Sequence, residues 1–192
     1  MKTIINVQTK KLLADLQTPV GIYLKIRDIY PESTLLESSD YHSDDNSYSL
    51  IGVKAIASFK VQNEQIIKEY PCGKVDIEEL DESIELTSAF QSFLKKFEVR
   101  GNNSTGLNGF MGYTSYDAIR YFEDVDPINT KLENADVPEF YYNLYHFIIV
   151  INHLKNELTI VENLLDGEIS KIDELEAVLL LSLIHISEPT RP

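Results

Sequence analysis

Two short segments hold the residues whose types and spacing best suit ligand binding or catalysis. The first runs from Leu35 to Asp40 (LLESSD), where a carboxylate and hydroxyls follow two leucines. If this segment is a strand, Leu35 and Glu37 face one side while Leu36 and Ser38 face the other. A carboxylate and a hydroxyl at a strand end can bind the amino group and other polar atoms of a small ligand. Spacing alone nevertheless favours an ordinary edge strand that enters a polar loop.

The second segment runs from Asn108 to Glu123 (NGFMGYTSYDAIRYFE). Glycines at strand positions, here Gly109 and Gly112, indicate a close backbone approach or a kink. Asp117 and Arg120 lie three residues apart on an expected helix and can pair there. Taken alone, this spacing favours tight packing between a sheet and a helix.

Other sets typical of catalysis are missing from the sequence. It contains neither the phosphate-binding G-x-x-x-x-G-K loop nor the G-x-S-x-G elbow of a serine hydrolase. The four histidines lack ligand spacing, and the single cysteine disfavours a zinc site. The carboxylates from Asp76 to Glu85 could chelate a cation, but a solvated face or a helix start is the favoured interpretation. We therefore expect no catalytic residue and no metal ligand in this chain.

Composition and charge narrow the class of protein further. Of the 192 residues, 43% are hydrophobic and 25% are charged, which is typical of a globular domain. The net charge of −14 argues against binding to nucleic acid or to anionic membranes, because phosphates are repelled. Cys72, the single cysteine, has no partner for an intramolecular disulfide. We find no signal peptide and expect a cytoplasmic protein.

The last residues are set apart from the rest. Leu181 to Arg191 reads LSLIHISEPTR, which looks like the translation of a transposase adapter used in sequencing-library preparation. A genuine amphipathic segment is the alternative. We expect residues 181–192 to be non-native and exclude them from the fold.

Hydrophobic periodicity and turn signals place the elements that must position these residues. Thr18 before Pro19 marks a helix start, and the turn from His153 to Asn156 marks a hairpin. Helices are expected over residues 8–16, 19–29, 87–97, 116–122 and 169–180, and strands over 33–38, 48–53, 55–61, 65–70, 108–113, 140–153 and 157–161. Strands in meanders with helices between them predict an α+β fold, with antiparallel sheets and flanking helices.

Taken in order, these motifs resemble the large component of anthranilate synthase, a family of chorismate-binding enzymes. TPVGIYLKIRD (18–28) is similar to a helix of the family, LLESSD to its LLES motif and NSYSLIGV (46–53) to the strand that follows. NGFMGYTSYDAIRYFE resembles the family's G-x-x-GY-x-x-YD-x-x-R-x-x-E segment. DVPEFYYNLYHFIIVINHLKNELTIVEN (136–163) resembles its D-x-P hairpin with an HLK turn. The resemblance covers residues 1–170.

The resemblance implies a function. The family converts chorismate to anthranilate in tryptophan biosynthesis, with ammonia from a glutamine amidotransferase subunit, its partner. Residues 1–170 would be the incomplete amino-terminal domain of a larger α/β sandwich enzyme, and residues 171–180 the start of a truncated linker or helix. Chorismate and Mg²⁺ would be held by a carboxy-terminal part, so this fragment by itself is expected to be inactive. The LLES motif would contribute Leu36, Glu37 and Ser38 to a feedback site for tryptophan. The basic residue that the family carries in the next strand is not evident, since Asn46 and Tyr48 stand there.

Three alternatives stay open. The large component of aminodeoxychorismate synthase, which leads to para-aminobenzoate, shares this domain, although the LLES and GY-x-x-YD-x-x-R forms favour anthranilate synthase. A stand-alone module that binds an amino acid without catalysis is the second. The third is a scaffold for the amidotransferase subunit, which would associate with that subunit but bind no tryptophan.

Overall fold

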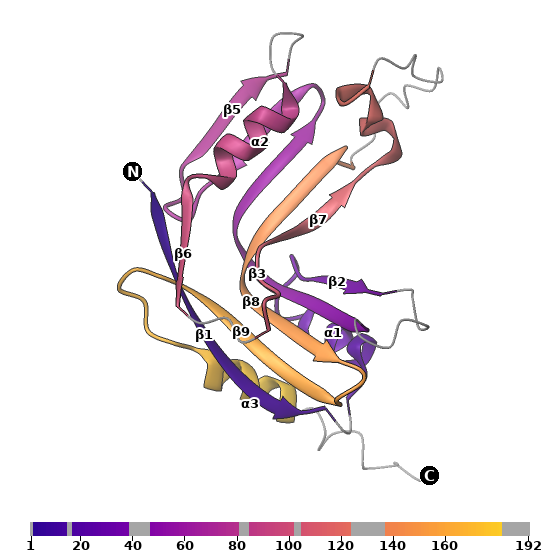
Figure 1. The fold of residues 1–192 in the computed structure, drawn as a ribbon, viewed down its shortest axis with the longest axis vertical. Helices are drawn as coiled ribbons and strands as arrows, with labels where there is room; N and C mark the ends of the chain where they lie inside the picture. The colour runs from indigo at the N-terminus through magenta and orange to yellow at the C-terminus, as the bar shows by residue number, and fades with distance from the viewer. Residues whose placement is uncertain are drawn as a thin grey trace. The chain divides into compact units, whose positions relative to one another are not determined.

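The computed structural model describes residues 2–14, 17–38, 47–80, 85–101, 105–123 and 137–181, and its elements are drawn in Figure 1. They follow in the order β1 (Thr3–Leu13), α1 (Pro19–Ile26), β2 (Thr34–Glu37), β3 (Tyr48–Gln62), β4 (Gln65–Glu69), β5 (Val75–Glu79), α2 (Leu86–Leu94), β6 (Phe97–Gly101), β7 (Phe110–Thr114), the 3-10 helix η1 (Tyr116–Tyr121), β8 (Phe140–Asn152), β9 (Glu157–Leu165) and α3 (Ile172–Leu181). The pairs β1–β9, β2–β3, β3–β4, β4–β5, β7–β8 and β8–β9 are antiparallel. The predicted α+β class is confirmed. No helix in the described part of the chain is long and apolar enough to cross a membrane.

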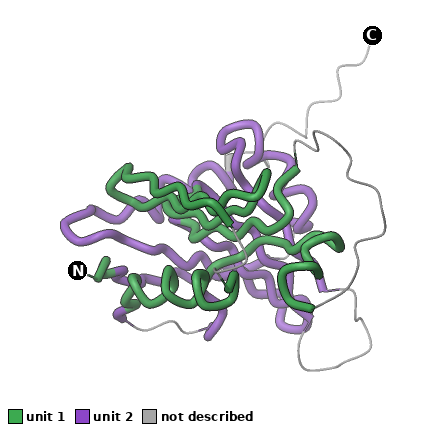
Figure 2. The backbone as a smooth tube through the Cα atoms, turned by 90° about the horizontal axis from the view of Figure 1, so that it is seen from above, with its two compact units in different colours: residues 1–4, 55–99, 109–145 green, residues 5–54, 100–108, 146–192 purple. Residues whose placement is uncertain are grey.

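The chain forms two compact units, shown in Figure 2. Unit 1 comprises residues 1–4, 55–99 and 109–145, and unit 2 comprises residues 5–54, 100–108 and 146–192. Strands β1, β3, β6 and β8 each contribute residues to both units. The two strands predicted at 48–53 and 55–61 are both part of β3. The predicted boundary between them falls on Lys54. Its φ of 60° lies in the left-handed region, which lysine rarely adopts.

Unit 1 is built around an aromatic core. Its strands are hydrogen-bonded in the order β5-β4-β3-β8, and β7 also pairs with β8. Phe90 and Phe93 of α2 contact Phe59 of β3, with ring centroids 5.0 and 5.5 Å away. Phe140 of β8 and Phe110 of β7 complete the cluster, 5.1 Å from Phe90 and 5.5 Å from Phe93 respectively. The helix predicted over residues 87–97 is present but ends at Leu94, and Phe97 belongs to β6.

Unit 2 carries the LLES segment and has an aliphatic core. Its strands follow the order β3-β8-β9-β1-β6, and β2 pairs with β3. Side chains from α1 and α3 pack with the sheet in one cluster, whose buried members are Ile22, Ile26, Ile51, Val53, Phe147, Ile149, Ile151, Leu158, Ile160, Ile172, Leu175 and Leu179. Leu35 of β2 packs against the same cluster. Burial of this leucine fixes which face of β2 turns toward the core.

The start of α1 follows the predicted capping pattern. Thr18 Oγ1 accepts a hydrogen bond from Gly21 N at 3.0 Å, and Pro19 occupies the first helical position. The helix ends at Ile26, three residues before the predicted Ile29, and the Ile26 carbonyl accepts bonds from the next turn.

The helix predicted over residues 8–16 is wrong. Residues 3–13 form β1, which pairs with β9 from Ile5↔Leu165 to Leu13↔Glu157. The leucines at 12, 13 and 16 have helical spacing, but the preceding β-branched residues favour a strand. Nine cross-strand pairs with a segment far along the chain outweigh local propensity.

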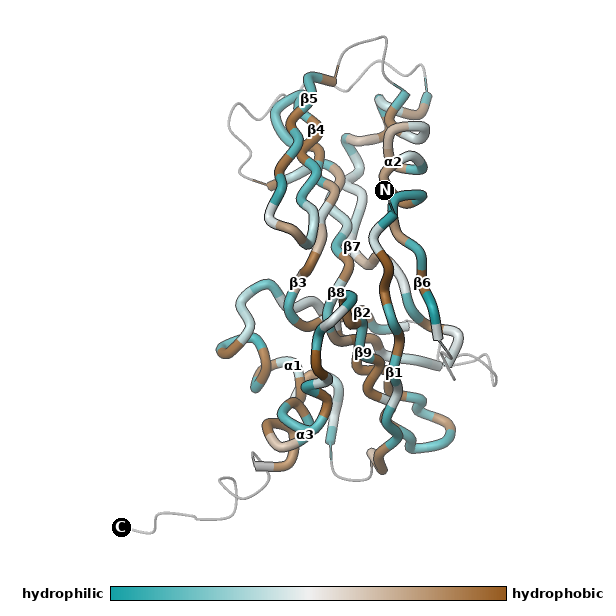
Figure 3. Tube along the Cα trace, turned by 90° about the vertical axis from the view of Figure 1, so that its left-hand side faces the viewer, coloured by the Kyte–Doolittle hydropathy of each residue, from teal (hydrophilic) through white to brown (hydrophobic). Residues whose placement is uncertain are grey.

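The sequence predicts no strand at β5 or β6, and both are present. In β5, Val75 and Ile77 alternate with acidic residues, a pattern visible as changing colours along this strand in Figure 3. Both apolar side chains are exposed, and Glu78 pairs with Lys68 at 2.6 Å. The described part of the acidic run is thus a mostly solvated strand. Residues 81–84 of this run, residues 102–104 and 124–136, and the adapter-like residues 182–192 lie outside the described residues.

One glycine of the second motif is required by close strand packing. An ideal Cβ on Gly112 would lie 1.9 Å from the carbonyl oxygen of Tyr141 and 2.7 Å from Cα of Tyr142. Neither is a flexible side-chain atom, so the backbones would have to separate. The predicted close approach is confirmed for this glycine.

We predict that Gly112→Ala lowers the free energy of unfolding by roughly 3 kcal/mol, the upper end of overpacking costs. Gly73→Ala is the matched control, because Gly73 has φ +79° but no atom within 4 Å of an added Cβ. Backbone strain alone should cost about 1 kcal/mol there. Urea unfolding followed by circular dichroism measures both, and equal losses would contradict the clash.

Candidate functional site

The three predicted ligand-binding residues lie on and just after β2. This strand pairs with β3 in the register Leu35↔Ile51, Leu36↔Leu50 and Glu37↔Ser49. The Ser38 backbone N–H extends the pairing with a bond to the Tyr48 carbonyl at 3.2 Å. Pairing with β3 therefore holds β2 along its whole length and one residue beyond its end.

The register separates these residues between two faces, as the alternation predicts. Residues directly opposite each other share a face, so Glu37 lies with Ser49, on the side of Leu35 and the fully buried Ile51. Leu36 lies on the other face and is 37% exposed. Glu37 and Ser38 are neighbours at the strand end, but the alternation places the Ser38 side chain on the face of Leu36, away from the Glu37 carboxylate.

Two residues that the sequence does not predict complete the polar cluster at Glu37. Ser49 Oγ lies 3.4 Å from Glu37 Oε1 and 2.8 Å from His153 Nε2. Ser49 is buried, with 1% of its surface exposed, whereas Glu37 and His153 are exposed. The sequence signal for Ser49 is its position two residues before Ile51, a spacing that places both side chains on the same face of β3. The signal for His153 is its position in the HLK turn.

This arrangement suits recognition of a small cation. Among the described residues, Glu37 accepts one long bond, from Ser49, and a carboxylate has further lone pairs that can accept a ligand's N–H groups. Hydrogen bonds between a carboxylate and an ammonium group are about twice as strong as neutral ones. The cluster is acidic, small and beside apolar side chains, which fits an amino acid better than a phosphate.

The second motif serves packing in the structure. Asn108 and Asn163 exchange two amide hydrogen bonds, of 2.8 and 3.0 Å, within unit 2. In unit 1, Arg120 pairs with Glu139 at 2.5 Å, and the Tyr121 hydroxyl donates to the same carboxylate. The predicted pair between Asp117 and Arg120 is wrong, because Glu139, just before β8, draws the guanidinium to the sheet. Burial and the bond to Glu139 raise the pKa of Tyr121 to about 12.

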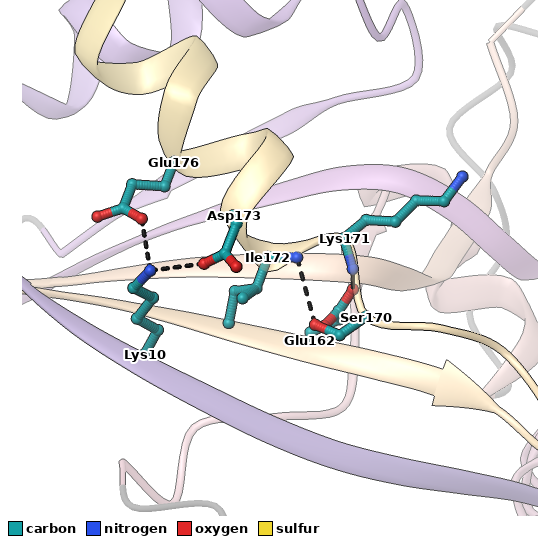
Figure 4. Close-up of polar contacts among 7 residues, drawn as sticks. All are labelled: Lys10, Glu162, Ser170, Lys171, Ile172, Asp173 and Glu176. Atoms are coloured by element: carbon teal, nitrogen blue, oxygen red, sulfur yellow. Dashed lines mark hydrogen bonds and ion pairs between the residues drawn. The ribbon is translucent and has the colours of Figure 1, made fainter.

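A buried carboxylate anchors the start of α3 in unit 2. Glu162 is fully buried and accepts bonds from Ser170 Oγ at 2.5 Å and Lys171 N at 2.7 Å (Figure 4). Lys10 of β1 holds the next turn through Asp173 and Glu176, at 2.6 and 2.5 Å. A buried carboxylate is tolerated only when its oxygens are hydrogen-bonded, so these contacts fix where α3 begins.

His146 lies beside this carboxylate. Its Nε2 is 3.3 Å from Glu162 Oε1, and its Nδ1 has no hydrogen-bond partner. Burial lowers the pKa of His146, and the charge of Lys54 acts in the same direction against the opposing effects of Glu168 and Glu162. The imidazole is thus harder to protonate than an exposed histidine.

Among the described residues, no group of three or more His, Cys, Asp or Glu side chains could hold a metal ion. The expectation that any Mg²⁺ ligands belong to another part of a longer protein stays a prediction.

Comparisons with known proteins find relatives that are named anthranilate synthase component 1. The chain is 28% identical over 152 residues to anthranilate synthase component 1 of Thermus thermophilus, covering 79% of this chain and 31% of that protein. It is also 28% identical over 188 residues to the same component of Acetivibrio thermocellus, covering 92% and 35%. A crystal structure of anthranilate synthase component I from Streptococcus pneumoniae TIGR4 matches with a TM-score of 0.49 and 18% identity, over 94% of this chain and 37% of that one. No protein-family model matches. The predicted resemblance to the large component of anthranilate synthase is confirmed, and the chain spans about a third of the length of these curated relatives.

The lowered pKa of His146 makes stability depend on pH. Because its folded-state pKa lies below that of the unfolded chain, the unfolded state binds the proton more readily. We predict that the free energy of unfolding falls as the pH is lowered from about 7 toward 5, through the range where an unfolded histidine gains its charge. His146→Gln should flatten the curve over this range. Urea titrations at several pH values test this, and parallel curves for the two proteins would contradict it.

Proposed function

We propose that this chain is the regulatory, tryptophan-binding part of an anthranilate synthase large component. The observation that carries the proposal is the LLES segment on β2, whose Glu37 carboxylate reaches the surface opposite the buried Ser49. Similarity to proteins named anthranilate synthase component 1 over most of the chain supports the choice of family.

Each predicted residue has a role in this proposal. The ligand would lie across the end of β2, where Glu37 accepts hydrogen bonds from the ammonium group of tryptophan on one face and the hydroxyl of Ser38 binds a further polar atom of the amino acid on the other. Leu36 contributes apolar contact from the opposite face of β2, against parts of the protein that lie outside this chain. Tryptophan is then a feedback inhibitor, which acts by changing how the site's surroundings pack and so lowers activity elsewhere.

The longer protein would convert chorismate and glutamine or ammonia to anthranilate, as a cytoplasmic lyase. A glutamine amidotransferase subunit would be its partner. Residues 1–170 would form the amino-terminal domain, with no catalytic residue. This chain by itself is proposed not to form anthranilate, because the resemblance assigns chorismate and Mg²⁺ to the carboxy-terminal part. The curated relatives that we compared carry the anthranilate synthase name, which supports this assignment over the para-aminobenzoate branch.

We predict that the chain binds L-tryptophan at the end of β2. In a ¹⁵N–¹H NMR titration, saturable shifts should centre on residues 35–38 and on Ser49. Glu37→Gln should weaken binding about tenfold, because a charged hydrogen bond is lost, and Ser38→Ala about fivefold. Glu32→Gln, a change at an exposed acid just before β2, is the matched control and should bind as the unsubstituted chain does. Shifts elsewhere, or none at β2, would contradict the proposal.

A further inference from the structure

The HLK turn, residues 153–155, plays no part in the proposed function as stated above. It joins β8, which ends at Asn152, to β9, which begins at Glu157. Asn152 Oδ1 accepts a bond from Lys155 N at 3.0 Å, and Asn156 adopts φ 50° to close the turn. The His153 backbone N–H donates to the Ser47 carbonyl at 3.1 Å. The turn is therefore tied to the start of β3, and the backbone of His153 is fixed.

The side chain of His153 points back to the candidate site. Its Nε2 lies 2.8 Å from Ser49 Oγ, and the same oxygen lies 3.4 Å from Glu37 Oε1. A hydroxyl has a single proton to donate, and an ionised carboxylate accepts hydrogen bonds but cannot donate one. If Ser49 donates its proton to Glu37, then it must accept from His153. The three groups form a directed chain, from imidazole N–H through the hydroxyl to the carboxylate.

We infer that His153 is a positioning residue of the amino-acid site, an inference that rests on the proposed function. Its Nε2–H occupies a lone pair of Ser49 and so directs the serine proton to Glu37. The carboxylate is held in place by that proton, and its remaining lone pairs face the ligand. Both the protonated imidazole and its neutral Nε2–H form supply this donor, so the role does not depend on a change of charge.

The alternative is that His153 only stabilises the hairpin. In that case its loss would lower stability and affect binding without regard to Ser49. The positioning role instead requires that the two residues act as a unit. Substitutions that act through one shared contact are not additive, and a double-mutant cycle measures this.

The test uses the complete chain, with L-tryptophan as the probe and its dissociation constant from NMR titration as the readout. His153→Phe keeps a flat ring without the donor, whereas His153→Gln keeps an N–H at the end of the side chain. We expect His153→Phe to weaken binding about fivefold, the effect of one ordinary hydrogen bond, and His153→Gln to restore most of it. In a chain that already carries Ser49→Ala, His153→Phe should have no further effect. Equal binding by the Phe variant and the unsubstituted chain would overturn the inference, as would independent effects at the two positions.

A second readout uses the unsubstituted chain and so does not depend on whether a variant folds. At alkaline pH, the imidazole ¹⁵N shifts of the unsubstituted chain should identify the Nε2–H tautomer at His153. The Nδ1–H tautomer there would overturn the inference but leave the proposed function intact. If the unsubstituted chain does not bind tryptophan at β2, then the proposed function fails and the inference fails with it.

Discussion

The candidate site depends on the register between β2 and β3. Since side chains alternate along a strand, a slip of one residue would turn Glu37 away from Ser49 and expose Leu35. Leu35 packs in the aliphatic core of unit 2, so a slip would lose that burial. Hydrophobic packing thus fixes the position of a polar group that contributes little to stability itself. The position of the Glu37 carboxylate thus follows from the burial of Leu35.

The same logic extends through unit 2. The core that receives Leu35 lies between the sheet and two helices, and α3 begins where Glu162 accepts the bonds of Ser170 and Lys171. Lys10 joins that helix to β1 by two ion pairs. A change in how these elements pack would reach β2 through contiguous side chains. In the proposed feedback, this contiguous packing would carry the effect of a ligand at Glu37 to a distant site.

Local signals predict part of this fold, and long-range pairing decides the rest. The cap of α1 and the β8–β9 hairpin follow from a few adjacent residues, and both are confirmed. The first strand is mistaken for a helix because its partner, β9, lies at the other end of the described chain. Glu37 is identified by its motif, but Ser49 is 12 residues away from it and His153 a further 104. Each residue has a local signal of its own, but neither signal links it to Glu37, and only the strand register brings the three residues together.

The central claim is that Glu37 recognises the amino group of a small amino acid. The most direct measurement compares L-tryptophan with indole-3-propionate, which lacks the amino group, and tryptamine, which lacks the carboxylate. We expect tryptophan and tryptamine both to produce saturable NMR shifts at β2 and indole-3-propionate to produce none. Binding of indole-3-propionate as tight as that of tryptophan would contradict it.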